Sequence, residues 1–405
     1  MKIFDTRVHT EGDYSLRRRT MANVHPLRPV LTSLAVLGFK IEDSSGAVTR
    51  IIFRLYLVLV TASLHYWALS DVVWYFRNRI QEDVLAESVT VWASMATVDL
   101  LIWKRKSFLK ILSTVKTETE KLSPEEQRRF KYVVWMVCFL TWGFNFLYIT
   151  QNLLFSLHVD HDKYFSNTPL YFFYKGMSEK QIAIFIRIDR SVECFFIQGT
   201  LTMIISLYIL LCINAKLWLK KFDDYDKPAS STYASSFTLD DVRCFRATFD
   251  QFARNIERLD DVFCEIVAMW LLMILITLCV RVLSLLNPRT PKTDRIIENT
   301  VLALSRAIVT LFVVSLVSGN VYDESVISLN KLEALVRRKE PVQNFAVYHE
   351  VQIAFQKFSF FPTQLTVWKV TPLNRSFLMT CIGMMTTYVI ICIQLNPSVL
   401  NSLSG

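Results

Sequence analysis

The sequence predicts an all-α, polytopic membrane protein with seven transmembrane helices. Apolar types make up 52% of the 405 residues and charged types only 20%, and the mean hydropathy is +0.31. The apolar residues are grouped into runs of about 20, the length that crosses the ~30 Å hydrocarbon layer of a bilayer. Only 9 residues are glycine and no alternating strand pattern recurs, which argues against a membrane β-barrel.

Seven apolar runs account for the predicted membrane spans. They cover residues 51–73, 84–103, 132–157, 191–217, 262–285, 299–318 and 374–395. The second run is the least apolar, because Glu87 and Asp99 lie in it. The segment before the first run is polar and basic and lacks the apolar stretch of a cleavable signal peptide. We therefore expect the first span to act as the internal insertion signal.

The distribution of lysine and arginine predicts how the spans are oriented. The N-terminal segment and the second, fourth and sixth connections hold 31 of these residues, whereas the other connections and the tail hold 10. Basic residues stay on the cytoplasmic side, so we expect the N-terminus inside the cell and the C-terminus outside. This inverted topology disfavours a G-protein-coupled receptor. The net charge of +9 then faces lipid headgroups and does not indicate nucleic-acid binding.

The spans and connections divide the chain into seven expected segments. These are a cytoplasmic N-terminal segment (1–50), four spans (51–217), a cytoplasmic loop with an amphipathic helix (218–261), two spans (262–318), a cytoplasmic anchor segment (319–373), a last membrane helix (374–396) and an outer tail (397–405). The fourth to sixth spans are expected to continue into a cytoplasmic bundle. Two apolar stripes at helical spacing indicate this, and their members are Leu239, Val242, Phe245, Phe249, Phe252, Ile256 and Leu259, then Tyr348, Val351, Phe355 and Phe358. The stripes predict packing either within one subunit or between subunits.

The last predicted helix contains a pattern that resembles the C-terminal signature of insect gustatory receptors. That signature is Thr-Tyr, five apolar residues, then Gln and Phe. Here it reads Thr387, Tyr388, residues 389–393, Gln394 and Leu395, and the upstream Leu373, Asn374, Arg375, Ser376 and Gly383 are also similar to the family.

Three positions depart from the family pattern. Leu395 stands where Phe is usual, and Leu365 and Lys369 stand where Phe and Gly are expected. Sweet-taste members typically carry an acidic residue within the apolar five, and residues 389–393 contain none. The resemblance therefore leans away from sugar receptors.

The resemblance implies a chemoreceptor in the plasma membrane that acts as a ligand-gated, non-selective cation channel. It implies a homo- or hetero-tetramer with other chemoreceptor subunits, opened by a small-molecule tastant, with permeant cations passing between the four last helices. The ligand would bind among the outer halves of the other helices. An insect odorant-receptor-type subunit of the same superfamily is the alternative. A secondary transporter is less favoured, because neither internal symmetry nor broken spans are seen.

One face of the last helix has the composition of a pore lining. Gln394, Ile391, Ile390, Thr387 and Gly383 share this face at steps of three and four residues. A ring of neutral amides would be hydrated and would select weakly among cations, and an aliphatic ring one turn below could close by dewetting. Tyr388 lies on a different side. The alternative role for Gln394 is a hydrogen bond between helices of one subunit.

The candidate ligand contacts are amides and aromatic residues in the expected outer halves of the spans. Such residues suit small organic ligands, although aromatic residues near a membrane interface also serve as anchors, as we expect for Tyr66 and Trp67. The candidates are Trp92, Asn145, Tyr148, Gln151, Asn152, Phe195, Phe196 and Gln198.

The remaining polar features predict structure more than chemistry. Arg306 lies within the sixth span and must be paired or hydrated, and Asp99 is a possible partner. His158 and His161 could bind a metal only if they lie on a helix, and a polar loop is the simpler reading. The 8 cysteines form no C-x-x-C pair and are expected to be packing residues. No nucleotide loop or nucleophile triad occurs, so neither an enzyme nor a cofactor is predicted.

Overall fold

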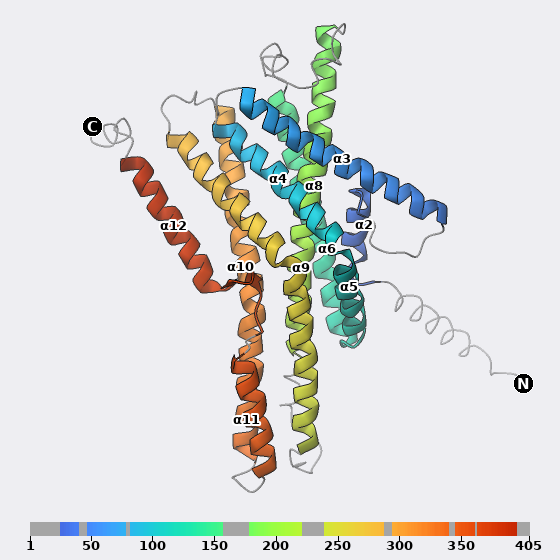
Figure 1. Cartoon of the computed structure of the whole chain (residues 1–405), viewed down its shortest axis with the longest axis vertical. Helices are drawn as coiled ribbons and strands as arrows, with labels where there is room; N and C mark the ends of the chain where they lie inside the picture. The colour runs from blue at the N-terminus through green and yellow to red at the C-terminus, as the bar shows by residue number, and fades with distance from the viewer. Residues whose placement is uncertain are drawn as a thin grey trace, which may run out of the picture.

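The fold is a bundle of tilted helices. The computed structural model describes residues 25–39, 47–77, 82–156, 178–220, 239–286, 294–339, 345–360 and 363–394. Within these residues, seven helices are long and apolar enough to cross a bilayer, as the sequence predicts. Six of these pack against one another, and the last lies at the edge of the bundle (Figure 1). The predicted all-α membrane fold class is confirmed.

The described elements are helices, with one small hairpin before the last of them. In chain order they are α2 (Arg28–Val36), α3 (Ala47–Arg77), α4 (Glu82–Trp103), α5 (Arg105–Glu120), α6 (Pro124–Ser156), α8 (Glu179–Lys220), α9 (Leu239–Leu286), α10 (Asp294–Lys339), α11 (Phe345–Phe360), β1 (Thr366–Val367), β2 (Thr371–Pro372) and α12 (Arg375–Gln394). The apolar spans within them are Ala47–Ser70, Leu85–Trp103, Pro124–Gln151, Arg187–Lys220, Val242–Leu285, Thr300–Lys331 and Arg375–Gln394.

Three helices are much longer than a bilayer is thick. α8, α9 and α10 contain 42, 48 and 46 residues. At 1.5 Å per residue they are about 63 to 72 Å long, roughly twice the hydrocarbon thickness. α9 and α10 continue to one end of the molecule, where α11 packs against both (Figure 1). The predicted extension into a bundle is therefore present for the fifth and sixth spans.

The centre of the bundle is built from aromatic side chains whose polar atoms have partners. Trp270 of α9 donates its indole N–H to Thr97 Oγ1 at 3.0 Å, and the hydroxyls of Tyr208 and Ser318 lie 2.8 Å apart. The Tyr208 ring contacts both Phe263 and Trp270, with centroids 5.2 and 5.9 Å apart. These contacts join α4, α8, α9 and α10 without leaving the buried indole and hydroxyl donors unsatisfied.

The apolar stripe of α9 is buried inside one subunit. Phe249 is fully buried, and its ring lies 6.0 Å from that of Phe245 and 5.9 Å from that of Phe252. The other buried members are Val242, Ile256 and Leu259. Of the two interpretations of this stripe, the structure supports packing within the subunit.

The stripe of α11 is divided between a buried and an exposed side. Val351 is buried against Val242 of α9, and Glu350 forms an ion pair with Arg246. In contrast, Tyr348 is 55% exposed and Phe355 is 36% exposed. The side chain of Phe358 lies outside the described residues. The apolar stripe of α9 is thus buried, whereas part of the apolar stripe of α11 is exposed.

Two packed helices were not predicted from the sequence. α2 lies within the segment expected to be a cytoplasmic N-terminus, yet Ser33 Oγ accepts the indole N–H of Trp142 at 2.9 Å. A Cβ at Gly199 of α8 would lie 3.0 Å from Leu37, so α2 approaches α8 as closely as a glycine allows. α5, between the second and third spans, buries Phe108, Ile111, Leu112 and Val115.

We expect Trp270→Ala to destabilise the subunit strongly. Removing a buried tryptophan leaves a cavity and costs about 3–5 kcal/mol, and here Thr97 also loses its hydrogen bond. The matched control is Trp135→Ala, because Trp135 is 64% exposed on the outside of the subunit. The measurement is the temperature at which the detergent-solubilised protein loses its monodisperse elution peak. Equal shifts for the two variants would contradict the packing described above.

Candidate pore helix and ligand site

A strained two-residue turn precedes the last membrane helix. Val370 N–H donates to Val367 O at 3.0 Å, and the two residues between them, Trp368 (φ 54°) and Lys369 (φ 59°), have left-handed backbone conformations. Two-residue hairpin turns with both residues left-handed favour glycine and asparagine, because other side chains cost about 1–2 kcal/mol each in this conformation. Lys369 stands where the family resemblance leads us to expect glycine, so other interactions must stabilise the turn.

Two consecutive carboxylates of α9 stabilise this turn. Lys369 Nζ lies 2.8 Å from Asp260 Oδ2 and 2.7 Å from Asp261 Oδ1. Asp260 also accepts hydrogen bonds from N and Oγ1 of Thr366, at 2.6 and 2.7 Å. Partial burial alone would lower the pKa of Lys369, but the hydrogen bonds and charges of Asp260 and Asp261 outweigh it and raise that pKa. Lys369 is therefore charged at neutral pH, and its stabilising effect is lost only as the pH rises through the raised pKa.

The motif residues upstream of the last helix form its N-terminal cap. Asn374 Oδ1 accepts the backbone N–H of Phe377 at 3.0 Å, which satisfies one of the free N–H groups at the start of α12. Arg375 forms an ion pair with Asp323 of α10 at 3.2 Å. These contacts explain the amide side chain at Asn374 and the guanidinium at Arg375.

The same segment approaches α10 closely. Leu373 is buried, and its N–H donates to Leu365 O at 2.8 Å across the hairpin. A Cβ at Gly319 would lie 3.4 Å from Asn374 Cα, so α10 needs a small residue there. Ser376 is exposed. The hairpin and cap thus set where α12 leaves the bundle.

The predicted pore face of α12 is open in the single subunit. Only Leu378 and Cys381 of this helix are buried, and they lie on the side that packs toward α9 and α10. Tyr388 is half-buried, and a Cβ at Gly383 would meet no atom within 4 Å. The opposite face is exposed, and its members are Thr387, Ile390 (49%), Ile391 (46%) and Gln394.

Three predicted ligand contacts lie together around Arg306 of α10. The Arg306 guanidinium donates to Gln198 Oε1, and its Cζ lies 5.1 Å from the centre of the Tyr148 ring. Asn145, one turn before Tyr148 on α6, accepts the Thr202 hydroxyl at 3.0 Å through Oδ1. The structure therefore joins α6, α8 and α10 through polar side chains, and we name Arg306, Gln198, Tyr148 and Asn145 the Arg306 cluster.

Aromatic rings border this cluster along the seam between α6 and α8. The Phe195 ring lies 5.7 Å from that of Trp142 and 5.3 Å from that of Phe196. Phe195 precedes Gln198 by one turn of α8, and Trp142 precedes Asn145 by one turn of α6. Trp142 was not predicted, although its spacing from Asn145 could have indicated the shared face.

The other ligand candidates lie apart or outside the description. Trp92 of α4 donates its indole N–H to Ala68 O at 3.4 Å. Gln151 is half-buried one turn beyond Tyr148, and the side chain of Asn152 lies outside the described residues. Tyr66 is 38% exposed, whereas Trp67 is 7% exposed and packs in the core rather than at an interface.

Asp99, the possible partner of Arg306 in the sequence, does not pair with it. Asp99 Oδ2 instead lies 3.3 Å from His65 Nε2 of α3, and Arg306 contacts Gln198 and Tyr148. The position of a residue along its predicted span does not indicate which neighbouring helix it will contact when the helices are tilted. His158 and His161 lie outside the described residues, among which no cluster with metal-ligand composition occurs. Four of the cysteines, Cys138, Cys212, Cys264 and Cys381, are buried as expected.

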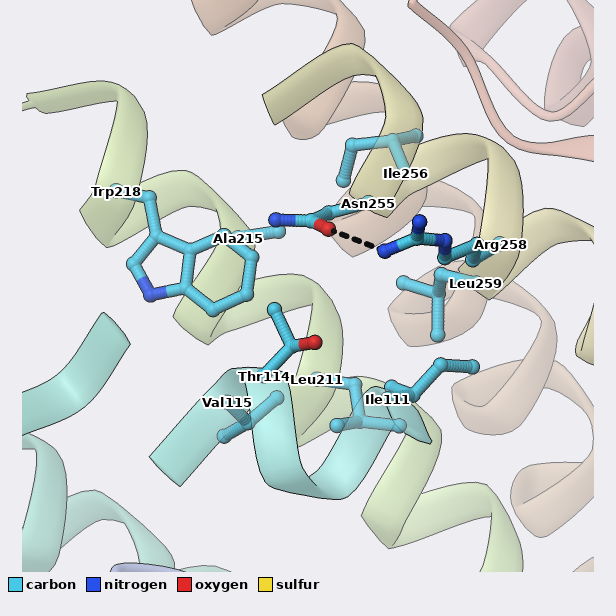
Figure 2. Close-up of a pocket in the computed structure, with 10 residues that line it drawn as sticks. All are labelled: Ile111, Thr114, Val115, Leu211, Ala215, Trp218, Asn255, Ile256, Arg258 and Leu259. Atoms are coloured by element: carbon cyan, nitrogen blue, oxygen red, sulfur yellow. Dashed lines mark hydrogen bonds between the residues drawn. The ribbon is translucent and has the colours of Figure 1, made fainter. Parts of the chain in front are cut away.

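Two cavities in the described part of the chain lie away from the Arg306 cluster. One, of about 20 Å³, lies between α5, α8 and α9, and Asn255 Oδ1 accepts a hydrogen bond from Arg258 at its wall, at 3.3 Å (Figure 2). Its α8 residues, from Leu211 to Trp218, are about 20–30 Å along the helix from Gln198. The other, of about 50 Å³, is mainly apolar and includes Leu34 and Phe39. Neither is lined by a predicted ligand contact.

Comparison with solved structures identifies the fold. The olfactory receptor OR5 of Machilis hrabei in complex with eugenol matches with a TM-score of 0.70 and 15% identity, over 91% of this chain and 98% of that one. The chain has the insect olfactory receptor fold. A second structure of OR5 matches with a TM-score of 0.70 and 14% identity, over 95% of this chain and 100% of that one. No family model matches the sequence, and no curated protein is a significant match.

We expect Asp260→Ala to destabilise the join between α9 and α12 much more than Asp261→Ala. Asp260 is 4% exposed, and its loss leaves N and Oγ1 of Thr366 without their acceptor and Lys369 with only the more exposed Asp261, which should cost about 3 kcal/mol. The Asp261 side chain is 57% exposed and contributes one screened ion pair, of about 1 kcal/mol or less. Thermal melts followed by tryptophan fluorescence measure the difference. If the two variants melt together, the buried carboxylate does not hold the turn.

Proposed function

We propose that this chain is a subunit of a tetrameric, ligand-gated, non-selective cation channel that serves as a chemoreceptor in the plasma membrane. The N-terminus faces the cytoplasm, as the distribution of basic residues predicts. The last helix of each subunit lines the pore. The ligand binds at the Arg306 cluster among the outer halves of α6, α8 and α10.

The exposed face of α12 is the observation on which this proposal depends. α12 is held firmly at its start by the turn, the cap and Arg375, yet its polar face is left uncovered by its own subunit. Gln394 on a lipid-facing surface would lose its hydrogen bonds, at a cost of several kcal/mol. Facing a central, hydrated axis, the same face of four subunits would surround the permeant cations and close at Ile391 or Ile390.

A taste receptor is the favoured chemoreceptor class. The Thr387–Tyr388 pair followed by five apolar residues and Gln394 supports the gustatory branch. The similarity of the fold to the olfactory receptor OR5 supports the alternative, an odorant-receptor-type subunit. Both would use the same pore and differ in their ligands.

We expect Gln394→Arg to reduce cation current on the order of tenfold, because four positive charges at the pore mouth repel cations. Gln394→Glu places four negative charges at the same positions and should raise the preference for cations over anions. Whole-cell currents and reversal potentials under a chloride gradient measure both effects, with surface labelling to confirm equal expression. Wild-type permeation in both variants would show that Gln394 does not line the pore.

We expect Phe355→Asp to weaken the tetramer without unfolding the subunit. Phe355 belongs to the α11 surface left open by its own subunit, and a buried carboxylate between subunits would be costly. Gln356→Asp is the control, because Gln356 is the next residue and is also exposed. Native gels and cross-linking of the full-length protein report the assembly state. Tetramers of undiminished yield for Phe355→Asp would place the subunit contact elsewhere.

A further inference from the structure

Arg306 has an unusual environment for a cation in a membrane-spanning helix. Both of its contacts in the described part of the chain, the Gln198 amide and the Tyr148 ring, are neutral. Two other cations of the spanning helices differ in this respect. Arg281 of α9 lies 3.9 Å from Glu87, and Lys216 of α8 lies 3.5 Å from Glu324. The charge of Arg306 is therefore not neutralised by an ion pair within the described residues.

A guanidinium in this position is costly for the fold alone. A cation within a spanning helix requires a carboxylate, water or another acceptor to offset its desolvation. A neutral donor such as glutamine could make the same hydrogen bond to Gln198 Oε1 without that cost. The guanidinium thus carries a positive charge that no ion pair within the described residues offsets and that a bound anion would neutralise.

Asn145 supplies a second unused donor on the same seam. It is only 3% exposed, and its Nδ2 has no hydrogen-bond partner in the described part of the chain, although Oδ1 accepts from Thr202. Thr202 follows Gln198 by one turn of α8. Asn145 and the guanidinium of Arg306 are therefore linked through Thr202 and Gln198. Unsatisfied buried donors cost about 1–3 kcal/mol each, unless a ligand provides the acceptor.

The neighbouring rings indicate what accompanies such an acceptor. Trp142, Phe195 and Phe196 form a continuous aromatic wall beside Asn145 and Gln198. Aromatic surfaces of this kind bind flat apolar bodies, while a few polar groups fix their orientation. A carboxylate accepts at both of its oxygens and pairs well with a guanidinium.

We infer that the ligands of this receptor are small aromatic carboxylates, whose carboxylate pairs with Arg306 and accepts a hydrogen bond from Asn145 Nδ2. The aromatic body packs against Trp142 and Phe195. That such a ligand opens a channel rests on the proposed function. Its binding can be measured on purified protein, whether or not a channel opens.

The test compares two probes that differ only in their terminal group, the carboxylate of 3-phenylpropionate and the neutral amide of 3-phenylpropionamide. Their binding to purified full-length protein is measured by calorimetry. Wild-type protein should bind the carboxylate on the order of tenfold to a hundredfold more tightly than the amide. Arg306→Gln should abolish this preference and retain the affinity for the amide, and Arg306→Lys should keep part of it, because a lysine lacks the two-pronged geometry.

Asn145→Leu is the third variant, and it should weaken binding of the carboxylate more than binding of the amide. Size-exclusion profiles establish that each variant is assembled as in the wild type. Equal affinity of the wild type for both probes, or no binding of the carboxylate, overturns the inference. An unchanged preference in an assembled Arg306→Gln variant overturns it as well.

Currents in cells separate this inference from the proposed function. If the carboxylate binds the purified protein but evokes no current, the ligand class holds and the channel proposal fails. If the amide evokes current at the same concentration as the carboxylate, the channel proposal is supported and the inferred ligand class is wrong. Current that the carboxylate evokes at much lower concentration than the amide supports both.

Discussion

The placement of the last helix depends on one buried carboxylate. Asp260 of α9 accepts two hydrogen bonds from Thr366 and pairs with Lys369, and so fixes a turn whose residues are both in an unfavourable backbone conformation. α12 begins a few residues later, and only two of its side chains are buried in the subunit. Its direction is therefore determined mainly at its base. A displacement of the long α9 helix at Asp260 would therefore move the base of α12 with it.

The membrane fold could be predicted from the sequence because a bilayer permits few backbone structures to cross it. Lipid cannot satisfy backbone groups, so each apolar run must be a helix, and the length of each run marks its span. The exposed face of α12 was predicted for a similar reason, since the three- and four-residue spacing from Gly383 to Gln394 specifies one side of a helix. The convergence of Asn145 and Tyr148 follows from the same spacing on α6.

The remaining features depend on contacts between distant parts of the chain. Sequence spacing does not indicate that Arg306 meets Gln198, 108 positions earlier, or that Asp99 meets His65. The left-handed turn at Lys369 could not be predicted from local sequence, because the carboxylates that stabilise it lie on another helix. α2 and α5 were missed for a different reason. Their apolar residues have helical spacing, but α2 is too short and α5 is too polar to be recognised as a span.

The shallow burial of α12 has a consequence for how the proposed channel would assemble. Most of the helices are ordered by contacts within their own chain, and these form as soon as the chain folds. In the proposed tetramer, the order of α12 beyond its first turns should instead follow mass action, because the surfaces that would cover it belong to other subunits. A newly made subunit without partners then exposes an amide and a row of aliphatic side chains to lipid. Retention of such subunits until they meet their partners would let a cell limit leak through incomplete channels.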